Sequence, residues 1–339
     1  MATIRDVAAM AGVSVSTVSY AMSGMRPISK GKKLSIENAM RQLNYKPHAA
    51  GRRPSGKKSK IIAILFPYVD HGLDLSEMEL ILQASKSAAR RGYYLVIWTM
   101  QTNSREELQQ FIGQSLVDGL ILMEVHTNDM RIDILREQNI PFILLGRDKE
   151  DSAETFIDID FSATMMNCIS YLKDLDYRRV IFINQTEQSL KAGYGPVVRT
   201  HEAFSYFCRN FDIQGSEYFC SSDPLDVCAV TENILTDCPR STAFIIMNNK
   251  ALPGLIKGIE KSGRRIPDDV SVVAIVSSAG SVSCFVPPIT AFEMDSTSIM
   301  DITVSQLIAK LNGKYEELPM RLIPCILRER QSTRRRTGN

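Results

Sequence analysis

The pattern of apolar and polar residues near the N-terminus predicts two short helices joined by a tight turn. Over residues 3–11 the apolar side chains fall on one helical face: Val7, Ala8 and Ala11. Thr3 is placed to cap this helix, because Asp6 stands three residues later, in the capping-box position. Gly12 supplies the turn, since glycine adopts a positive φ without steric cost.

The residues after this turn predict a second helix with a polar surface. Ser14 can cap it, and the side chains that follow are mostly hydrogen-bonding: Val15, Ser16, Thr17, Ser19 and Tyr20. Two such helices are typical of the helix-turn-helix, whose second helix lies in the major groove of DNA. A third helix is expected from Ser29 to near Asn44, with an apolar stripe formed by Leu34, Ile36, Ala39, Met40 and Leu43.

Beyond residue 60, short apolar runs alternate with helical segments. The expected strands are 61–66, 94–98, 119–123, 142–145, 180–183, 243–247 and 270–276, and the expected helices are 75–91, 104–115, 129–138, 161–174, 197–210, 225–237 and 249–262. This alternation predicts parallel sheets covered on both faces, arranged as two α/β subdomains. Ligands of such folds bind outside the carboxyl ends of the strands and in clefts between domains.

Charge divides the chain into the same two parts. The first 60 residues hold 12 lysines and arginines against two acidic residues, whereas the remainder holds 28 basic and 36 acidic residues. A small basic unit attached to a larger acidic one is the electrostatic footprint of a nucleic-acid binder. This coincidence favours the helix-turn-helix over its alternative, a pair of amphipathic helices in a larger bundle. Residues 47–60 are rich in Pro, Gly, Ser and basic side chains, so we expect a linker that also touches the nucleic acid.

The cysteine content favours a reducing compartment and argues against a structural zinc site. The seven cysteines are odd in number, contain no CxxC pair and have no histidine cluster beside them. Polar residues interrupt the N-terminus before the apolar core of a signal peptide forms, and no apolar run approaches the ~20 residues that cross a bilayer. We therefore expect a cytoplasmic protein with no cofactor and no metal.

Several ordered sequence blocks resemble the lactose-repressor (LacI/GalR) family of bacterial transcription regulators. These blocks are DVAAMAGVSVSTVS, ISKGKK, LNYKPH, IPDDVSVVAI, VPPIT and RERQST, and the likeness covers about residues 3 to 333. The resemblance implies a helix-turn-helix domain over residues 1–46, a hinge over 47–60 and a core over 61–330. The core would resemble periplasmic sugar-binding proteins, with two Rossmann-like subdomains divided near residues 159 and 290.

The resemblance also implies the partners. Members of the family are dimers or tetramers that bind a near-palindromic operator in double-stranded DNA. A small effector in the core cleft, here a sugar or sugar phosphate, changes the affinity for the operator. Because the C-terminal tail lacks the apolar heptads of a tetramerising helix, we expect a homodimer.

Carried over by position, the resemblance assigns base reading to Val15 and Ser16, and phosphate contacts to Thr17, Ser19 and Tyr45. The full set expected at the DNA is Thr3, Ser14, Val15, Ser16, Thr17, Ser19, Tyr20, Tyr45, His48, Arg52, Arg53 and Pro54. Tyr20 stands where many members have an arginine, and a tyrosine cannot make the bidentate guanine contact. For this residue a base contact and a packing or phosphate role remain alternatives.

The expected hinge departs from the family pattern. Pro54 occupies the position of a leucine that wedges into the minor groove, and Gly51 lies one turn earlier. An internal proline costs a helix ~3 kcal/mol and a glycine ~1 kcal/mol, so we expect a weak or shortened hinge helix. Two alternatives follow: Pro54 acts as the wedge with Arg52 and Arg53 in a narrow groove, or the segment is a plain basic linker.

The expected effector site departs as well. The residues that the resemblance places there are Phe161, Arg147, Arg199, Thr200, Asn248 and Ser277. Phe161 can stack on a sugar ring, and Asn248 keeps a ligand-contacting amide. Thr200 stands at the position of a familiar ligand arginine, Ser277 at that of a familiar acid. The site therefore takes a different ligand, binds weakly or has lost effector control.

The function expected from these features is repression of sugar-utilisation genes. An enzyme is the alternative class, but the sequence contains no GxSxG, Walker P-loop, HExxH or Rossmann glycine fingerprint, and its four histidines form no triad. Residues 193–196, GYGP, are a lone glycine loop and a weak signal. A third alternative is a regulator controlled by a protein partner in place of a small molecule.

Overall fold

The computed structural model describes residues 3–23, 28–43, 58–67, 74–100, 105–113, 116–148, 154–237, 242–314 and 319–336. Five of the residues expected at the DNA lie outside these ranges: Tyr45, His48, Arg52, Arg53 and Pro54. Gly51 lies outside them too, so the expected DNA contacts and the hinge alternatives stay predictions.

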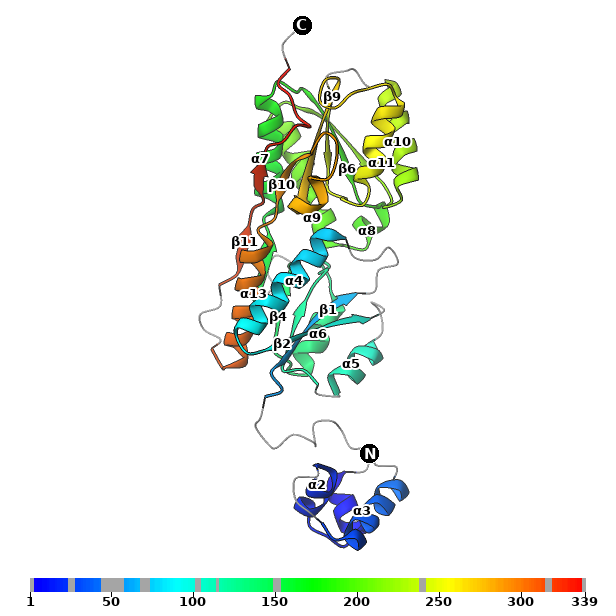
Figure 1. The fold of residues 1–339 in the computed structure, drawn as a ribbon, viewed down its shortest axis with the longest axis vertical. Helices are drawn as coiled ribbons and strands as arrows, with labels where there is room; N and C mark the ends of the chain where they lie inside the picture. Colours follow the sequence, from blue (N-terminus) through cyan, green and yellow to red (C-terminus); the bar gives the residue numbers. More distant parts are fainter. Residues whose placement is uncertain are drawn as a thin grey trace.

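The N-terminal unit is a cluster of three helices around a small apolar core (Figure 1). They are α1 (Ile4–Met10), α2 (Val15–Ser23) and α3 (Lys30–Gln42), as the periodicity predicts. The buried residues are Val7, Ala8, Val18, Ile36 and Ala39. Leu34, expected in the apolar stripe, is 57% exposed. The assignment was wrong because residues two apart lie on opposite sides of a helix, and Ile36 takes the inner face.

The core consists of two lobes, each built on a six-stranded sheet with helices on both faces (Figure 1). The first sheet has the order β11-β5-β4-β3-β1-β2, made of β1 (Ile61–Pro67), β2 (Tyr94–Met100), β3 (Gly119–Leu122), β4 (Phe142–Leu145), β5 (Phe156–Ile159) and β11 (Arg321–Ile323). All of its pairings are parallel. Its helices are α4 (Leu75–Arg90) and α13 (Ser296–Leu311) on one face, and α5 (Arg105–Gly113) and α6 (Met130–Glu137) on the other.

The second lobe repeats this design. Its sheet has the order β12-β10-β9-β8-β6-β7, made of β6 (Arg179–Asn184), β7 (Gln214–Phe219), β8 (Thr242–Ile246), β9 (Val270–Ser277), β10 (Thr290–Glu293) and β12 (Ile326–Arg328). One face is covered by α7 (Phe161–Asp174) and α9 (Gly195–Asn210), the other by α10 (Pro224–Asp237) and α11 (Leu252–Lys261). The short helices α8 (Glu187–Lys191) and α12 (Ala279–Val282) lie in loops.

The chain passes between the lobes three times. It crosses after β5, between β10 and α13, and between β11 and β12. The first two crossings lie beside the divisions expected near residues 159 and 290, and the third is not among those expected. Because the parallel strands of both sheets end near the crossings, their carboxyl ends face a shared cleft.

The C-terminal end of the linker is fastened to the first lobe. The carboxylate of Asp118 accepts the backbone N–H of Ser59 at 2.7 Å and that of Lys60 at 2.8 Å. The ammonium of Lys58 donates to the carbonyl of Leu311 and to Asn312 at the C-terminal end of α13, where cations are favoured. Lys58 therefore forms hydrogen bonds within the core, and the expected contact between the linker and nucleic acid stays a prediction.

None of the helices in the described ranges is long and apolar enough to cross a bilayer.

The pair α10 and α11 packs closely because α11 carries two glycines on the contact side. A Cβ added at Gly254 would lie 2.2 Å from the carbonyl oxygen of Pro224. At Gly258 it would lie 2.7 Å from that of Cys228. These two carbonyls belong to backbone, so neither can move aside like a flexible side chain.

We predict that Gly258→Ala destabilises the core by about 1–3 kcal/mol, since overpacking forces the two helices apart. Gly280→Ala is the matched control, because the nearest atom to its added Cβ is 4.0 Å away. It should leave stability unchanged or raise it by up to about 1 kcal/mol. Urea unfolding followed by circular dichroism measures both, and equal effects would contradict the packing argument.

Candidate DNA-binding and ligand-binding sites

Both helices of the N-terminal motif begin with side-chain caps. Thr3 and Asp6 form a reciprocal capping box at α1, with the Thr3 N–H donating to Asp6 at 2.7 Å. Ser14 Oγ accepts the backbone N–H of Thr17 at 3.2 Å at the start of α2. Gly12 has φ +64°, the turn conformation predicted for it. These caps fix where α2 begins and which of its side chains point outward.

The exposed face of α2 is narrow. Val15 is 41% exposed and Ser16 is also exposed, whereas Val18 is fully buried against the other helices. Thr17, Ser19 and Tyr20 are half-buried. Base-reading side chains must project from the start of the helix, and Val15 and Ser16 are the outward-facing residues of that turn. Their assignment as base readers is consistent with this exposure and stays a prediction.

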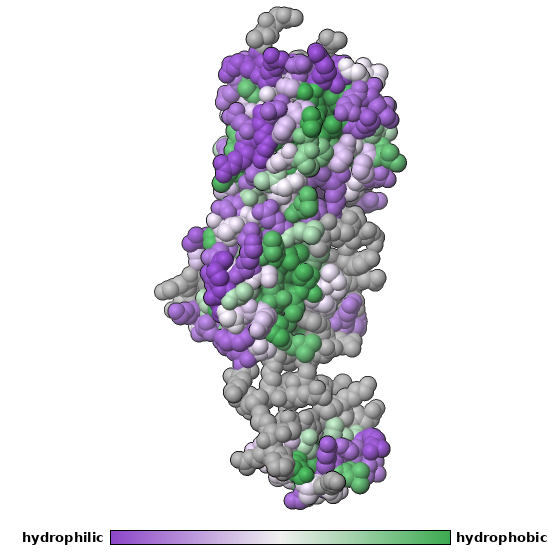
Figure 2. All heavy atoms as spheres, in the orientation of Figure 1, coloured by the Kyte–Doolittle hydropathy of each residue, from purple (hydrophilic) through white to green (hydrophobic). Residues whose placement is uncertain are grey.

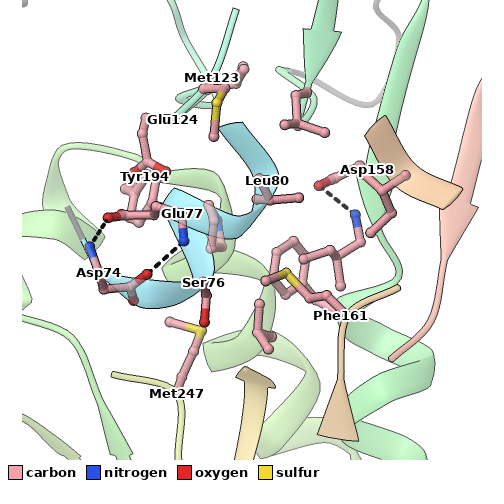
Figure 3. Close-up of a pocket in the computed structure, with 18 of the residues that line it drawn as sticks. Asp74, Ser76, Glu77, Leu80, Met123, Glu124, Asp158, Phe161, Tyr194 and Met247 are labelled. Atoms are coloured by element: carbon pink, nitrogen blue, oxygen red, sulfur yellow. Dashed lines mark hydrogen bonds between the residues drawn. The ribbon is translucent and has the colours of Figure 1, made fainter. Parts of the chain in front are cut away.

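A cavity lies between the two lobes at the carboxyl ends of the strands (Figure 3). Its polar lining is Asp74, Ser76, Glu77, Glu124, Asp158, Gln185, Tyr194 and Asn249, and its apolar lining includes Leu80, Met123, Phe161, Met247, Met294 and Ile299. The residues come from both lobes, so opening the cleft would take the cavity apart.

The start of α4 supplies two of the acids. Asp74 caps α4, and its carboxylate accepts the Glu77 N–H at 2.8 Å, while Glu77 accepts the Asp74 N–H at 2.6 Å (Figure 3). Burial, together with the nearby carboxylates of Glu124 and Asp74, raises the pKa of Glu77 to about 7. Lys250, from the second lobe, reaches Glu77 only at 3.9 Å.

Glu124 follows β3 in a left-handed backbone conformation, with φ +54°. The hydroxyl of Tyr194, from the other lobe, donates to its carboxylate, and burial raises the pKa of Glu124 despite this bond. Burial and the adjacent carboxylate raise the pKa of Tyr194 as well, so its hydroxyl stays protonated and donating. Figure 3 shows both side chains beside Glu77 at one end of the cavity.

Tyr194 belongs to the segment 193–195, which joins the second lobe to the first by backbone hydrogen bonds. The N–H of Thr127 donates to the carbonyl of Gly193 at 2.8 Å, and the N–H of Gly195 donates to that of Val125 at 3.1 Å. Gly193 has φ +74°, and a Cβ there would lie 2.5 Å from Thr127 Oγ1. The GYGP loop, a weak signal in sequence, therefore needs its first glycine for this crossing.

A second contact across the cleft involves three charged residues. Arg199 on α9 donates to the carbonyls of Arg147 and Asp148 at 2.7 and 2.9 Å. Its other terminal nitrogen lies 3.9 Å from Asp158, and Arg147 lies 3.3 Å from the same carboxylate. Burial raises the pKa of Asp158 to about 6, since it outweighs the pull of the two guanidinium groups.

The structure places the six expected effector residues in different surroundings. Phe161 lines the cavity. Arg147 and Arg199 line a second, more open pocket and not this cavity. Thr200 donates to the Pro196 carbonyl, Asn248 donates to Ser222, and Ser277 is fully buried; these three are not among the residues that line the cavity.

Several cavity residues were missed by sequence reasoning: Asp74, Glu77, Glu124, Tyr194 and Asn249. A usable signal existed for one of them. Glu124 comes directly after a buried strand, where the carboxyl-end rule places ligand contacts. Tyr194 carried no such signal, because its position depends on a backbone bridge to a distant segment.

Comparison with known proteins agrees with this architecture. Residues 3–48 match the model of bacterial regulatory proteins of the lacI family, and residues 169–333 match that of a periplasmic binding protein-like domain. The HTH-type transcriptional repressor PurR of Salmonella paratyphi A is 26% identical over 326 residues, which is 94% of this chain and 92% of the relative.

Solved structures share the fold over almost the whole chain. The transcriptional regulator CelR in complex with cellobiose has a TM-score of 0.70 at 21% identity and covers 98% of this chain and 100% of that one. The lac repressor dimer bound to operator and the anti-inducer ONPF has a TM-score of 0.71 at 21% identity and covers 98% of this chain and 99% of that one. The probable maltose operon repressor malR of Staphylococcus aureus has a TM-score of 0.73 at 18% identity and covers 82% of this chain and 99% of that one. The chain thus combines the DNA-binding domain of the lacI family of bacterial regulatory proteins, over residues 3–48, with a core that has the periplasmic binding protein-like fold.

Proposed function

We propose that this chain represses transcription by binding a near-palindromic operator as a homodimer, and that a small molecule in the cleft sets its operator affinity. The observation that carries the proposal is the capped start of α2, which exposes Val15 and Ser16 to a major groove. Five further residues flank this turn or follow it on α2 and are proposed to position the helix on phosphates or base edges: Thr3, Ser14, Thr17, Ser19 and Tyr20.

A regulatory role fits the cleft better than an enzymatic one. The cavity is built from residues of both lobes, so its occupant acts on how the lobes close. This arrangement also favours a small molecule over a protein partner as the regulator. Sugar-utilisation genes are the proposed targets, because the similar solved structures include a cellobiose complex and a maltose operon repressor.

The proposed dimer surface is the outer face of α4 with the edge strand β2. Leu75, Met78 and Leu82 are exposed at helical spacing on α4, and Tyr94 and Val96 are exposed on β2. Figure 2 shows this apolar patch in the middle of the visible face. A second copy of the chain is the proposed occupant, since a palindromic operator needs two N-terminal three-helix units related by a two-fold axis.

We predict that Ser16→Ala weakens operator binding by about 1 kcal/mol, or roughly fivefold in Kd, because a hydroxyl at a base edge is lost. The ratio of operator to non-specific affinity should fall by the same factor. Ser35→Ala is the matched control, as Ser35 is an exposed serine on α3. Gel-shift titration on the chain's own upstream region, at fixed salt, measures both variants. An unchanged ratio for Ser16→Ala would remove this residue from the base readers.

For the dimer surface, we predict that Met78→Glu with Leu82→Glu produces monomers, because two charges enter an apolar contact. Operator affinity should then fall by roughly 100-fold or more, since the two N-terminal DNA-binding units are no longer joined and each binds its half-site independently. Met130→Glu is the control, because Met130 is exposed on α6, on the opposite face of the same sheet. Sedimentation velocity reads the assembly, and a double variant that remains dimeric would place the interface elsewhere.

A further inference from the structure

The cavity wall carries an unbalanced charge. Four of its residues have carboxyl groups, namely Asp74, Glu77, Glu124 and Asp158, and none of the described residues lining it has an ammonium or guanidinium group. Asp158 is compensated by Arg147 and Arg199 from behind the wall. The carboxyl groups that no guanidinium group compensates therefore lie at the other end of the cavity, around Glu77 and Glu124.

The cations near these two glutamates only partly offset them. Arg131 is held by Asp129 and by the backbone carbonyls of Met123 and Glu124, outside the lining. Lys250 stands 3.9 Å from Glu77. Tyr194 donates a neutral hydrogen bond to Glu124, and the half-buried His126 lies against the Tyr194 ring at 5.7 Å. A positive charge entering the cavity would meet two carboxylates in a low dielectric, where the attraction is strong.

One further polar atom at this cavity is an acceptor without a partner. Asn249 uses its amide N–H groups to donate to Ser76 and to the Val276 carbonyl, which leaves its buried Oδ1 without a hydrogen-bond partner. Apolar side chains form much of the remaining wall, among them Phe161, Leu80, Met123 and Met247 (Figure 3). The cavity thus offers carboxyl and amide acceptors at one end, and none of the described residues that line it supplies the cationic donor that a phosphate or carboxylate favours.

We propose that the effector of this repressor is a small organic cation, whose protonated amine sits between Glu77 and Glu124 and whose body packs against Phe161 and the methionines. The inference rests on the proposed role of the cleft as the effector site. It names a ligand class, an amine with an apolar or hydroxylated body such as an amino sugar, and excludes sugar phosphates. Glu77 and Glu124 are then the residues that determine specificity.

A matched set of probes tests the charge preference directly. n-Butylammonium, n-butanol and butyrate share one apolar body and differ only in charge. At 20 mM, pH 8 and constant ionic strength, we expect n-butylammonium to raise the melting temperature of the full chain by roughly 2–4 °C and the other two to raise it less. The preference should shrink at pH 6, where Glu77, with its pKa of about 7, takes up a proton.

Two isosteric variants connect the preference to the cavity. Glu77→Gln keeps the capping box, and Glu124→Gln keeps an acceptor for Tyr194, so both should fold. Each should abolish the butylammonium preference. Glu260→Gln, on the exposed face of α11, should retain it. Equal shifts for the three probes, a preference for butyrate, or a preference that survives in both variants would each overturn the ligand class. The operator titration of Ser16→Ala is independent of this outcome, so a failed ligand class leaves the repressor assignment testable.

Discussion

The cleft depends on a pair of backbone hydrogen bonds between segments that are far apart in sequence. Residues 125–127 follow β3 of the first lobe, residues 193–195 precede α9 of the second, and their amides and carbonyls pair across the gap. This pairing brings Tyr194 to Glu124 and so completes the acidic end of the cavity. Side-chain contacts such as Arg199 to the carbonyls of residues 147 and 148 add to a closure that the backbone already defines.

The charges of the molecule are arranged for two different partners. The first 60 residues are strongly basic, as a phosphate-binding surface must be, while the larger core is acidic and would be repelled by the same DNA. Four carboxyl groups line the cavity in the cleft, and burial raises the pKa values of two of them, Glu77 and Glu124. A regulator built in this way holds its core away from nucleic acid while its ligand site attracts positive charge.

The sequence predicted local features well and tertiary ones poorly. Helix periodicity, the Thr3 cap and the Gly12 turn depend on neighbouring residues, and all three are confirmed. The helix α13 and the strands β5, β7, β10, β11 and β12 were not predicted from the sequence. The apolar pattern is weak in two of them, because β7 is largely exposed and α13 buries Thr303 and Gln306 along with its apolar side chains. Of the expected effector residues, Phe161 lines the cavity, since it begins a helix at a lobe crossing. The acids were missed because their role follows from the closure of two lobes.

The anchoring of Ser59 and Lys60 to Asp118 has a mechanical consequence. Lys58 is also bound at the end of α13, so residues 58–60 are held on the first lobe and the chain leaves that lobe from a fixed point. Any rotation of that lobe is carried in full to the point where the linker starts. In a two-fold dimer, a small hinge movement at the cleft would therefore change the distance between residues 58–60 of one copy and those of the other. The first lobe would in this way transmit ligand binding in the cleft to the two DNA-binding units.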